Sequence, residues 1–451
     1  MSMKIIALNG LLGYGYDEES LECVKKMDVD FIGVDAGSSD PGPHYLGSGT
    51  SFTDRGAVKR DIELALVYAL EKKIPFVIGS AGGAGGKIHV EWVKNIIDEI
   101  AAEHGLSFKM AIIQSEVTKD YVREKLRAGK IRDMGPGLPL TEEVIDRCDR
   151  IVTQIGIGPF MKALESDASV ILAGRACDTA IYAAPAIMAG MDMGLAFHMA
   201  KIMECGSMCS EPMTASDIMT ATIEKDSFTL EPANPARRCT VERVAAHTMY
   251  EQGNPYFIYE PDGFIDLKES KYEQVSARAV RVSNSRFHEA EVKTLKLEAA
   301  MLAGYRTISI AGINDPLTIR NIDFIFEAVK KFVAETMKDS IRPDEYFITL
   351  RKYGEALPGI AVPEMPVNNM GIILDVVADT QEKANTICAL ARARMLHTDY
   401  PGRKSTAGNL AFPYSPSDIY CGAVYTFGMY HLAVVDDLCE TSSISFVKVG
   451  E

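Results

Sequence analysis

Residues 74–102 constrain the fold more than any other stretch, because they join an apolar run, a glycine-rich loop and an amphipathic segment. The apolar run 75–78 predicts a buried parallel strand, and five of the eight residues 79–86 are glycines. Beyond the loop, apolar residues recur at helical spacing over 90–100. A strand, a glycine loop and a helix in this order direct backbone N–H groups and a helix N-terminus toward an anion.

The glycine loop does not match two common phosphate-binding patterns. A P-loop needs glycine, four residues and then Gly-Lys-Ser/Thr, and the residues around Gly86-Lys87 fail at both the first glycine and the hydroxyl. The dinucleotide pattern Gly-x-Gly-x-x-Gly fits the loop in no register. We therefore expect the loop, with Ser80, Gly82 and Gly83, to let a carboxylate or phosphate approach the backbone closely. The alternative is a tight turn where a helix packs closely on a strand.

Strand and helix patterns alternate through the first half of the chain. Strands are predicted at 4–8, 31–34, 75–78, 108–113, 150–155 and 168–173, with helices between most of them. Such alternation indicates parallel βαβ units, so we predict an α/β fold whose N-terminal, mostly parallel sheet is flanked by helices in a Rossmann-like three-layer sandwich. Ligands of such sheets gather at the carboxyl ends of the strands.

The pattern changes after about residue 212, where short segments are broken by prolines. Mixed strands and helices follow and predict a C-terminal α+β domain. The segment 292–302 is predicted as a helix, and 305–311 as a strand. We expect three parts: an α/β domain at 1–212 with the glycine-loop anion site, an α+β domain at 213–406 and a closing segment at 407–451.

Composition excludes several classes of partner. The net charge of -15 over 451 residues argues against nucleic acid or an anionic membrane as the main partner. The apolar runs are too short to span a bilayer, which needs roughly 20 residues. The nine cysteines are scattered and lack a metal-binding pattern, which favours reduced thiols in a cytoplasm and no structural metal.

Asp35 and His44 are candidate acid/base residues on the loop after the second strand. Asp35 ends the strand, where a carboxylate over a cleft suits a general base, and His44 follows nine residues later as a second acid/base. The alternatives are that Asp35 caps the following turn and that His44 bonds only to backbone.

Arg175 and Asp178 occupy another strand–turn–helix junction, at residues 170–180. An arginine at a strand's carboxyl end suits a substrate carboxylate or phosphate. Asp178 falls in the first helical turn, where a carboxylate is favoured by the helix dipole, and this is also its alternative explanation.

Glu204 and Arg237 complete the set of candidates. Glu204 lies in the last turn of a predicted helix, where the dipole disfavours a carboxylate, and local rules tend to be broken at functional sites. Its alternative is an exposed ion pair with Lys201. Arg237, next to Arg238, is a candidate for holding a phosphate or a partner, with solvated surface charge as the alternative.

Three motifs together resemble the acyclic terpene utilisation (AtuA-like) family. They are Gly79-Ser80-Ala81-Gly82-Gly83, Gly174-Arg175 with Asp178, and Glu204-Cys205-Gly206. The resemblance covers most of residues 4 to about 400, and Ser80 stands where the family has asparagine. The resemblance implies a cytoplasmic metabolic enzyme. It also implies that the gene lies beside genes for carboxylate or acyl-CoA metabolism and a gene for a small companion protein.

These observations lead to one enzymatic hypothesis and one non-catalytic alternative. The chain would be a lyase, hydratase or isomerase that moves a proton beside the carbonyl or carboxylate of a small carboxylic acid or its CoA thioester. Asp35 or Glu204 would be the base, and Arg175 with the loop N–H groups would hold the anion. No cofactor is expected, with carboxylate-bound Mg²⁺ left open. The alternative is a large subunit that binds an acyl ligand or a small partner protein, and we also expect a homo-oligomer.

Overall fold

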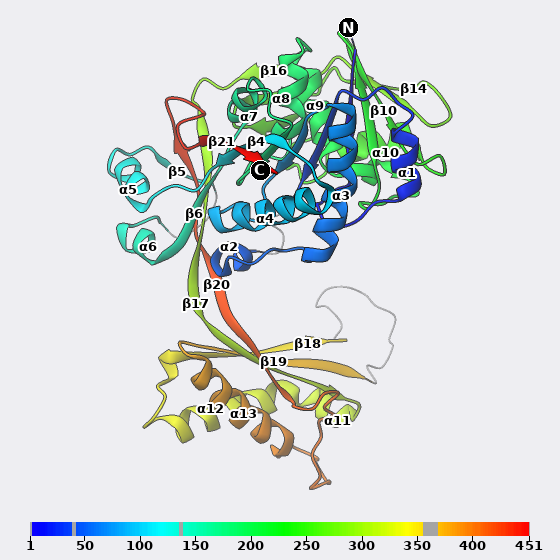
Figure 1. Cartoon of the computed structure of the whole chain (residues 1–451). Helices are drawn as coiled ribbons and strands as arrows, with labels where there is room; N and C mark the ends of the chain where they lie inside the picture. The colour runs from blue at the N-terminus through cyan, green and yellow to red at the C-terminus, as the bar shows by residue number, and fades with distance from the viewer. Residues whose placement is uncertain (1, 38–41, 135–138, 355–368, 451) are drawn as a thin grey trace. The chain divides into compact units, whose positions relative to one another are not determined.

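The computed structural model describes residues 2–37, 42–134, 139–354 and 369–450 (Figure 1). The chain forms two compact units. Unit 1 comprises Met1–Met301 and Phe427–Glu451, and unit 2 comprises Leu302–Thr426. These boundaries differ from the expected 1–212, 213–406 and 407–451, and that three-part division stays a prediction.

Unit 1 is built on a ten-stranded sheet whose five central strands are parallel. The parallel strands, in sheet order, are β1 (Met3–Ala7), β2 (Phe31–Asp35), β3 (Phe76–Gly79), β7 (Val170–Ala173) and β4 (Phe108–Gln114). Antiparallel strands extend both sides: β9 (Met219–Ile223), β10 (Ser227–Pro232), β15 (Val280–Ser283) and β14 (Lys271–Gln274) beyond β1, and β21 (Ser443–Val449) beyond β4. The predicted α/β fold with a mostly parallel N-terminal sheet is confirmed.

Alternating side chains of the central strands enter two hydrophobic cores, one on each face of the sheet. Ile5 and Ala7 pack with α7 (Ile157–Leu164), α8 (Ala180–Met188) and α9 (Met193–Met203). Ile6 and Leu8 pack instead with α1 (Glu18–Val24), α3 (Arg55–Lys72) and α4 (Lys87–His104). Full burial of such a side chain contributes about 1.5–3 kcal/mol. The result is the expected three-layer arrangement of helices, sheet and helices.

Smaller elements complete unit 1. The helices are α2 (His44–Ser48), α5 (Lys119–Arg127), α6 (Glu142–Arg147) and α10 (Val241–Thr248). The strands are β5 (Ile131–Asp133), β6 (Cys148–Gln154), β8 (Ser210–Glu211), β11 (Arg238–Cys239), β12 (Phe257–Glu260), β13 (Gly263–Asp266) and β16 (Arg286–Glu289). Among the described residues, no helix combines the length and the apolar character needed to cross a membrane.

The helix predicted at 292–302 is wrong, because this segment begins the long strand β17 (Thr294–Ile313). Its first part pairs antiparallel with β6, and the part from Tyr305 to Ile313 pairs with β19. Lysine, leucine, glutamate and alanine favour a helix locally. The buried side chains of Leu295, Leu297 and Ala299 nevertheless alternate at the period of two that a strand requires.

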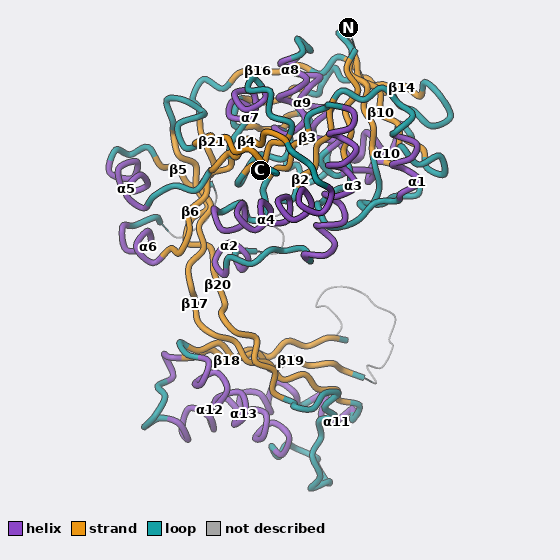
Figure 2. The backbone as a smooth tube through the Cα atoms, in the orientation of Figure 1, coloured by secondary structure: helices purple, strands orange, loops and turns teal. Residues whose placement is uncertain are grey.

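Unit 2 is an α+β unit in which two long helices pack against strands. Its strands are β18 (Tyr346–Tyr353), β19 (Met370–Ala378), the later part of β17 and the first part of β20 (Asp418–Val434). Its helices are α11 (Pro316–Arg320), α12 (Ile322–Met337) and α13 (Gln381–His397), and Figure 2 shows α12 and α13 side by side along these strands. The core forms where Ile325 and Val329 of α12 meet Ile387 of α13 and Leu374 of β19.

Candidate active site

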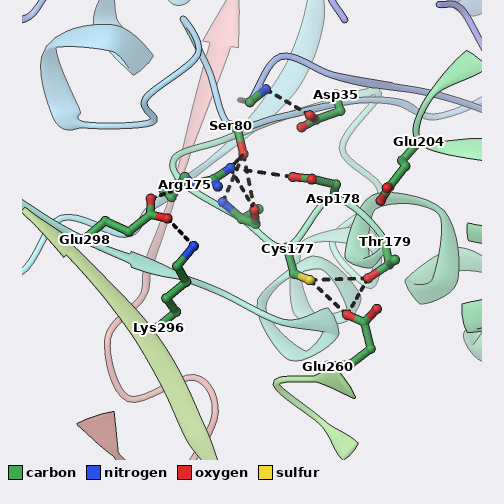
Figure 3. Close-up of polar contacts among 12 residues, drawn as sticks. Asp35, Ser80, Arg175, Cys177, Asp178, Thr179, Glu204, Glu260, Lys296 and Glu298 are labelled. Atoms are coloured by element: carbon green, nitrogen blue, oxygen red, sulfur yellow. Dashed lines mark hydrogen bonds and ion pairs between the residues drawn. The ribbon is translucent and has the colours of Figure 1, made fainter. Parts of the chain in front are cut away.

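A cavity of about 150 Å³ lies at the carboxyl ends of β1, β2 and β7 in unit 1. Parallel strands that end at one edge bring their following loops together, which is why this edge forms a site. The residues that line the cavity are Gly10, Leu11, Tyr14, Asp35, Gly37, Arg175, Asp178, Glu204, Cys205, Met208, Ala215, Tyr250 and Glu251. Four of the candidates from the sequence, Asp35, Arg175, Asp178 and Glu204, are therefore brought together, as Figure 3 shows.

Arg175 is held in place by a buried network. Its Nε donates to Glu298 Oε2 at 2.9 Å, and its Nη1 donates to Ser80 Oγ at 3.2 Å. The same Nη1 lies 3.5 Å from Asp178 Oδ1. Burial acts to lower the pKa of Arg175, but the Glu298 and Asp178 carboxylates outweigh it and raise that pKa, so the guanidinium stays charged. Among the described residues, Nη2 makes no hydrogen bond, so this nitrogen is available to a substrate oxygen.

Glu298 is the main counter-charge of Arg175, and it comes from β17. Lys296, two residues earlier on the same strand, lies 2.7 Å from Glu298 Oε1. Burial acts to raise the pKa of Glu298, but Arg175 and Lys296 together lower it to about 2. Glu298 is therefore ionised at neutral pH and fixes the orientation of the Arg175 guanidinium.

Asp35 has one satisfied oxygen and one without a partner. Its Oδ2 accepts a hydrogen bond from the Gly37 N–H at 3.0 Å. Its Oδ1 is buried and has no hydrogen-bond partner among the described residues. Burial and the nearby Asp178 carboxylate raise the pKa of Asp35 well above its ordinary value. The Asp35 carboxyl group therefore favours its protonated form.

Asp178 lies beside Arg175 in the lining of the same cavity. Its Oδ1 is buried and, among the described residues, accepts no hydrogen bond. Burial raises the pKa of Asp178, while the positive charges of Arg175 and Lys201 act to lower it. Arg175 and Lys201 thus both oppose the effect of burial at Asp178, and Arg175 opposes it at Asp35.

Glu204 is the C-cap of α9 and lies beside Lys201, one turn earlier, in a short hydrogen bond with its Nζ. The sequence left open an exposed ion pair between these two residues; the pair forms, but both side chains are buried. Burial raises the pKa of Glu204 to about 8, even though Lys201 acts to lower it. Gly206, two residues after this C-cap, begins a short 3-10 helix with a φ of 56°, the left-handed conformation that glycine adopts most easily.

Glu260 binds the two residues on either side of Asp178. Glu260 Oε2 accepts hydrogen bonds from Thr179 Oγ1 at 2.7 Å and from Cys177 Sγ at 2.9 Å. Burial raises the pKa of Glu260 to about 7 and raises the pKa of the Cys177 thiol well above its ordinary value. Cys177 is therefore a thiol at neutral pH, which makes it a weak nucleophile.

The glycine loop uses much of its backbone to pack against the turn after β7. The Ser80 and Ala81 N–H groups donate to the carbonyls of Gly174 and Ala173, and Arg175 N–H donates to Gly85 O at 3.1 Å. A Cβ atom on Gly85 would lie 2.1 Å from Arg175 N. The alternative interpretation of the loop, a tight turn that allows close packing, therefore describes Gly85 well.

An internal carboxylate already occupies the helix end that follows the loop. The N–H of Lys87, the first residue of α4, donates to Glu116 Oε2 at 2.7 Å. A helix N-terminus favours an anion, and here the chain supplies it from the segment after β4.

The other predicted substrate-binding residues lie outside the cavity. Ser80 is buried behind it, where its Oγ accepts from Arg175 and from the Ala176 N–H at 3.1 Å. A Cβ on Gly82 would lie 3.0 Å from the His89 Cβ, and one on Gly83 would lie 3.0 Å from the Phe52 Cβ. Contact of these three residues with a substrate stays a prediction.

His44 and Arg237 also lie away from the cavity lining. His44 is the exposed first residue of α2, with its ring edge-on to Tyr45 at a centroid distance of 5.2 Å. Arg237 lines a different cavity, where its Nε donates to Asp217 Oδ2 at 2.8 Å. The acid/base role of His44 and the substrate contact of Arg237 stay predictions.

Three partners of the site have no strong signal in the sequence. Glu298 and Lys296 occupy polar positions between the buried residues of a strand that resembles a helix in composition. Glu260 is the last residue of the short strand β12, next to the exposed Tyr259. Asp35 was predicted because it is a carboxylate at the end of a strand. Glu260 also lies at the end of a strand, but β12 is short and its sequence predicts a strand less clearly.

Within the described residues, no group of three or more His, Cys, Asp or Glu side chains is arranged to hold a metal ion. A requirement for Mg²⁺ stays a prediction.

Comparison with known proteins places the chain in one family. No curated protein and no solved structure matched the chain. The family model described as "Acyclic terpene utilisation family protein AtuA" matches residues 18–402, which include all four candidates that line the cavity. The chain therefore belongs to the acyclic terpene utilisation family AtuA.

Proposed function

We propose that this protein is a lyase, hydratase or isomerase that moves a proton next to the carbonyl or carboxylate of a small carboxylic acid or its CoA thioester. One observation carries the proposal: Asp35 Oδ1 and Asp178 Oδ1 are both buried at the cavity and accept no hydrogen bond among the described residues, with Arg175 Nη1 at 3.5 Å from Asp178 Oδ1 as an ion-pair contact. Buried polar atoms in proteins are nearly always bonded, so these two oxygens mark positions where a substrate can bind. Membership of an acyclic terpene utilisation family supports a metabolic role.

The protonation states of the carboxyl groups support acid/base chemistry at neutral pH. The pKa values of Asp35, Asp178 and Glu204 are all raised, the last to about 8, so these carboxyl groups exchange protons closer to neutral pH than ordinary carboxyl groups do. A pair of carboxyls in different environments can divide the roles of acid and base. We assign the base to Asp178, because Arg175 and Lys201 favour its ionised form, and the acid to Asp35.

In the proposed reaction, Asp178 takes a proton from the carbon next to the substrate carbonyl. Arg175 Nη2 donates to the carbonyl oxygen, which gains negative charge as the proton leaves. For a hydratase running in the direction of dehydration, Asp35 gives its proton to the leaving hydroxyl group, so a double bond forms and water departs. For an isomerase, Asp35 gives the proton to a different carbon instead. The cavity of about 150 Å³ suits the reacting end of a small acid.

Deuterium exchange tests the proposal without knowledge of the complete reaction. A panel of unsaturated and hydroxy acids and their CoA thioesters is incubated with the protein in D2O, and NMR follows exchange at the carbon next to the carbonyl. We expect exchange with the wild type and a loss of roughly 10²–10⁴-fold in Asp178→Asn, the usual contribution of a positioned acid or base. Asp262→Asn is the matched control, because burial also raises the pKa of Asp262, to about 6, outside the cavity lining.

Arg175→Lys tests the oxygen-binding role separately. Lysine keeps the positive charge beside Glu298 but lacks the second terminal nitrogen. The KM for the exchanging substrate should rise while the protein stays folded. Equal exchange in the wild type, Asp178→Asn and Asp262→Asn would sink the proposed chemistry. Binding of an acid or thioester without any exchange would point instead to the non-catalytic subunit.

A further inference from the structure

A second cavity in unit 1, of about 480 Å³, is lined by four arginines. This volume lies within the range of ligand pockets, roughly 300–1,000 Å³. It shares no lining residue with the cavity at Asp35. Its charged lining consists of four guanidinium groups and one carboxylate, in a chain whose net charge is -15. These residues are Arg237, Arg238, Arg243, Arg278 and Glu211, and we call them the arginine pocket.

Two of the arginines are fixed and shape the pocket. Arg278 donates from Nη2 to the carbonyl of Pro232 at 2.6 Å and from Nη1 to Glu231 Oε1 at 3.0 Å. Arg237 donates from Nε to Asp217 at 2.8 Å. Because the carboxylates of Glu231 and Asp217 balance the charges of these two side chains, their role is to hold the loop in shape.

The other two arginines are held loosely by one shared carboxylate. Glu211 Oε2 accepts from Arg238 Nη2 at 3.2 Å, and Glu211 Oε1 lies 3.5 Å from Arg243 Nε. The first contact follows from strand register, because Arg238 pairs with Glu211 across β8 and β11. Both guanidinium groups are exposed, and each uses one nitrogen on Glu211 where an arginine can offer two.

Arg243 also breaks a local rule. It lies in the first turn of α10, whose N-cap Thr240 accepts from the Arg243 N–H. The helix dipole disfavours a cation at this end. An arginine at a position that is unfavourable for the helix, beside a cavity lined by other arginines, indicates that its charge serves to bind a ligand.

We propose that the arginine pocket binds the diphosphate group of a ligand, and that Arg238 and Arg243 exchange Glu211 for its oxygens. A diphosphate offers several charged oxygens to the planar forks of arginine, whereas Glu211 offers two to both side chains. A nucleotide, a CoA-type carrier and free diphosphate share this chemistry. The proposal stands apart from the reaction proposed for the first cavity.

Calorimetry with inorganic diphosphate tests the arginine pocket directly. The wild type should bind it, and the double variant Arg238→Gln with Arg243→Gln should bind it roughly ten- to a hundredfold more weakly, since a hydrogen bond to a charged group is lost. The control is Arg281→Gln with Arg342→Gln, which removes the same charge at two exposed arginines outside the pocket lining. No binding to the wild type, or equal weakening in the control, would overturn the proposal.

Glu211→Gln gives a test of opposite sign that misfolding cannot imitate. Removing the competing carboxylate should tighten diphosphate binding, and unchanged or weaker binding would contradict the exchange. ADP and CoA then identify the source of the group: tighter binding of either than of diphosphate assigns the pocket to that carrier, and equal binding assigns it to diphosphate alone. Asp178→Asn should leave diphosphate binding unchanged, so failure of the arginine pocket and failure of the proposed reaction are separable.

Discussion

At the level of single residues, Arg175 links the cavity to the interior of unit 1. Its side chain contacts Ser80 after β3, Asp178 after β7 and Glu298 on β17. Taking two charges out of water is unfavourable, and their attraction compensates only while both partners are present. The pair of Arg175 and Glu298 should therefore matter more to folding than a pair on the surface.

Glu298→Ala should lower the free energy of unfolding by about 3–5 kcal/mol, because it leaves the buried Arg175 guanidinium without its main partner. The comparison is Glu273→Ala, which breaks an exposed pair with Arg281 and should cost about 0–1 kcal/mol. Urea denaturation of both variants measures the difference. Equal losses would show that Arg175 is not held by Glu298 in solution.

Glu204 should make stability depend on pH. Its pKa is raised from 4.5 to about 8 in the folded chain, so between these values the folded state binds more protons than the unfolded state. The free energy of unfolding contributed by this group therefore falls as the pH rises from about 4.5 to 8, with a slope of at most about 1.4 kcal/mol per pH unit.

Urea denaturation at several pH values checks the Glu204 prediction against Glu204→Gln, which does not titrate. The difference in stability between the wild type and the variant should shrink or reverse as the pH approaches 8. A difference that is constant with pH would contradict the raised pKa.

The sequence predicted the residues of the cavity that follow strands and missed those that approach from elsewhere. Asp35 and Arg175 follow recognisable parallel strands, and the carboxyl ends of parallel strands meet by construction. Glu298 arrives on an antiparallel strand whose pairing depends on segments more than a hundred residues apart. The spacing of residues along a short stretch of sequence therefore cannot predict the contact between Glu298 and Arg175.

At the level of elements, the glycine loop between β3 and α4 works mainly by permitting contact. Gly85 has a φ of 66° and leaves no room for a side chain beside Arg175 N. Gly105, at the other end of α4, has a φ of 61° but open space around it. The two glycines share the left-handed backbone conformation and differ only in how closely other atoms pack around them.

Gly85→Ala should therefore destabilise the protein far more than Gly105→Ala. The left-handed conformation costs roughly 1–2 kcal/mol at either position, and overpacking adds about 1–3 kcal/mol at Gly85 alone. Thermal unfolding of the two variants measures this, and the exchange assay should show lost activity only in Gly85→Ala, where the turn carrying Arg175 must shift. Similar melting temperatures for the two would refute the packing role.

The elements also show where sequence patterns succeed and fail. The sequence predicts helices at 55–72 and 322–337, where apolar residues recur over many turns, and the helices Arg55–Lys72 and Ile322–Met337 match these ranges. In β17, residues that favour a helix hide the alternation of buried side chains. The pairing of this segment with β6 and β19 is what makes it a strand. The strand at 150–155 was found, but as β6 it pairs with β17 and not with the parallel strands.

At the level of the whole molecule, the C-terminal strand β21 completes the sheet of unit 1. It pairs with β4 along its length, from Ser443 with Gln114 to Val449 with Phe108. Glu440, just before it, forms an ion pair with Lys125 Nζ at 2.5 Å. The sheet edge at β4 is thus covered by residues from the opposite end of the chain.

Deletion of residues 437–451 should expose the edge of β4 and make the protein prone to aggregation, because unpaired strand edges template pairing with other chains. Light scattering and soluble yield would measure this, with deletion of residue 451 alone as the control. A soluble, monodisperse truncated protein with unchanged melting temperature would show that β21 is dispensable.

The position of β21 has a consequence for biosynthesis. The ribosome makes residues 1–301 of unit 1 before it makes unit 2, and β21, at Ser443–Val449, joins the first sheet only after unit 2 has been made. At roughly 5–20 residues per second, the nascent sheet waits for on the order of ten seconds with its β4 border uncovered. Unit 2 emerges during this interval, so in the cell the middle of the polypeptide can finish folding before its beginning does.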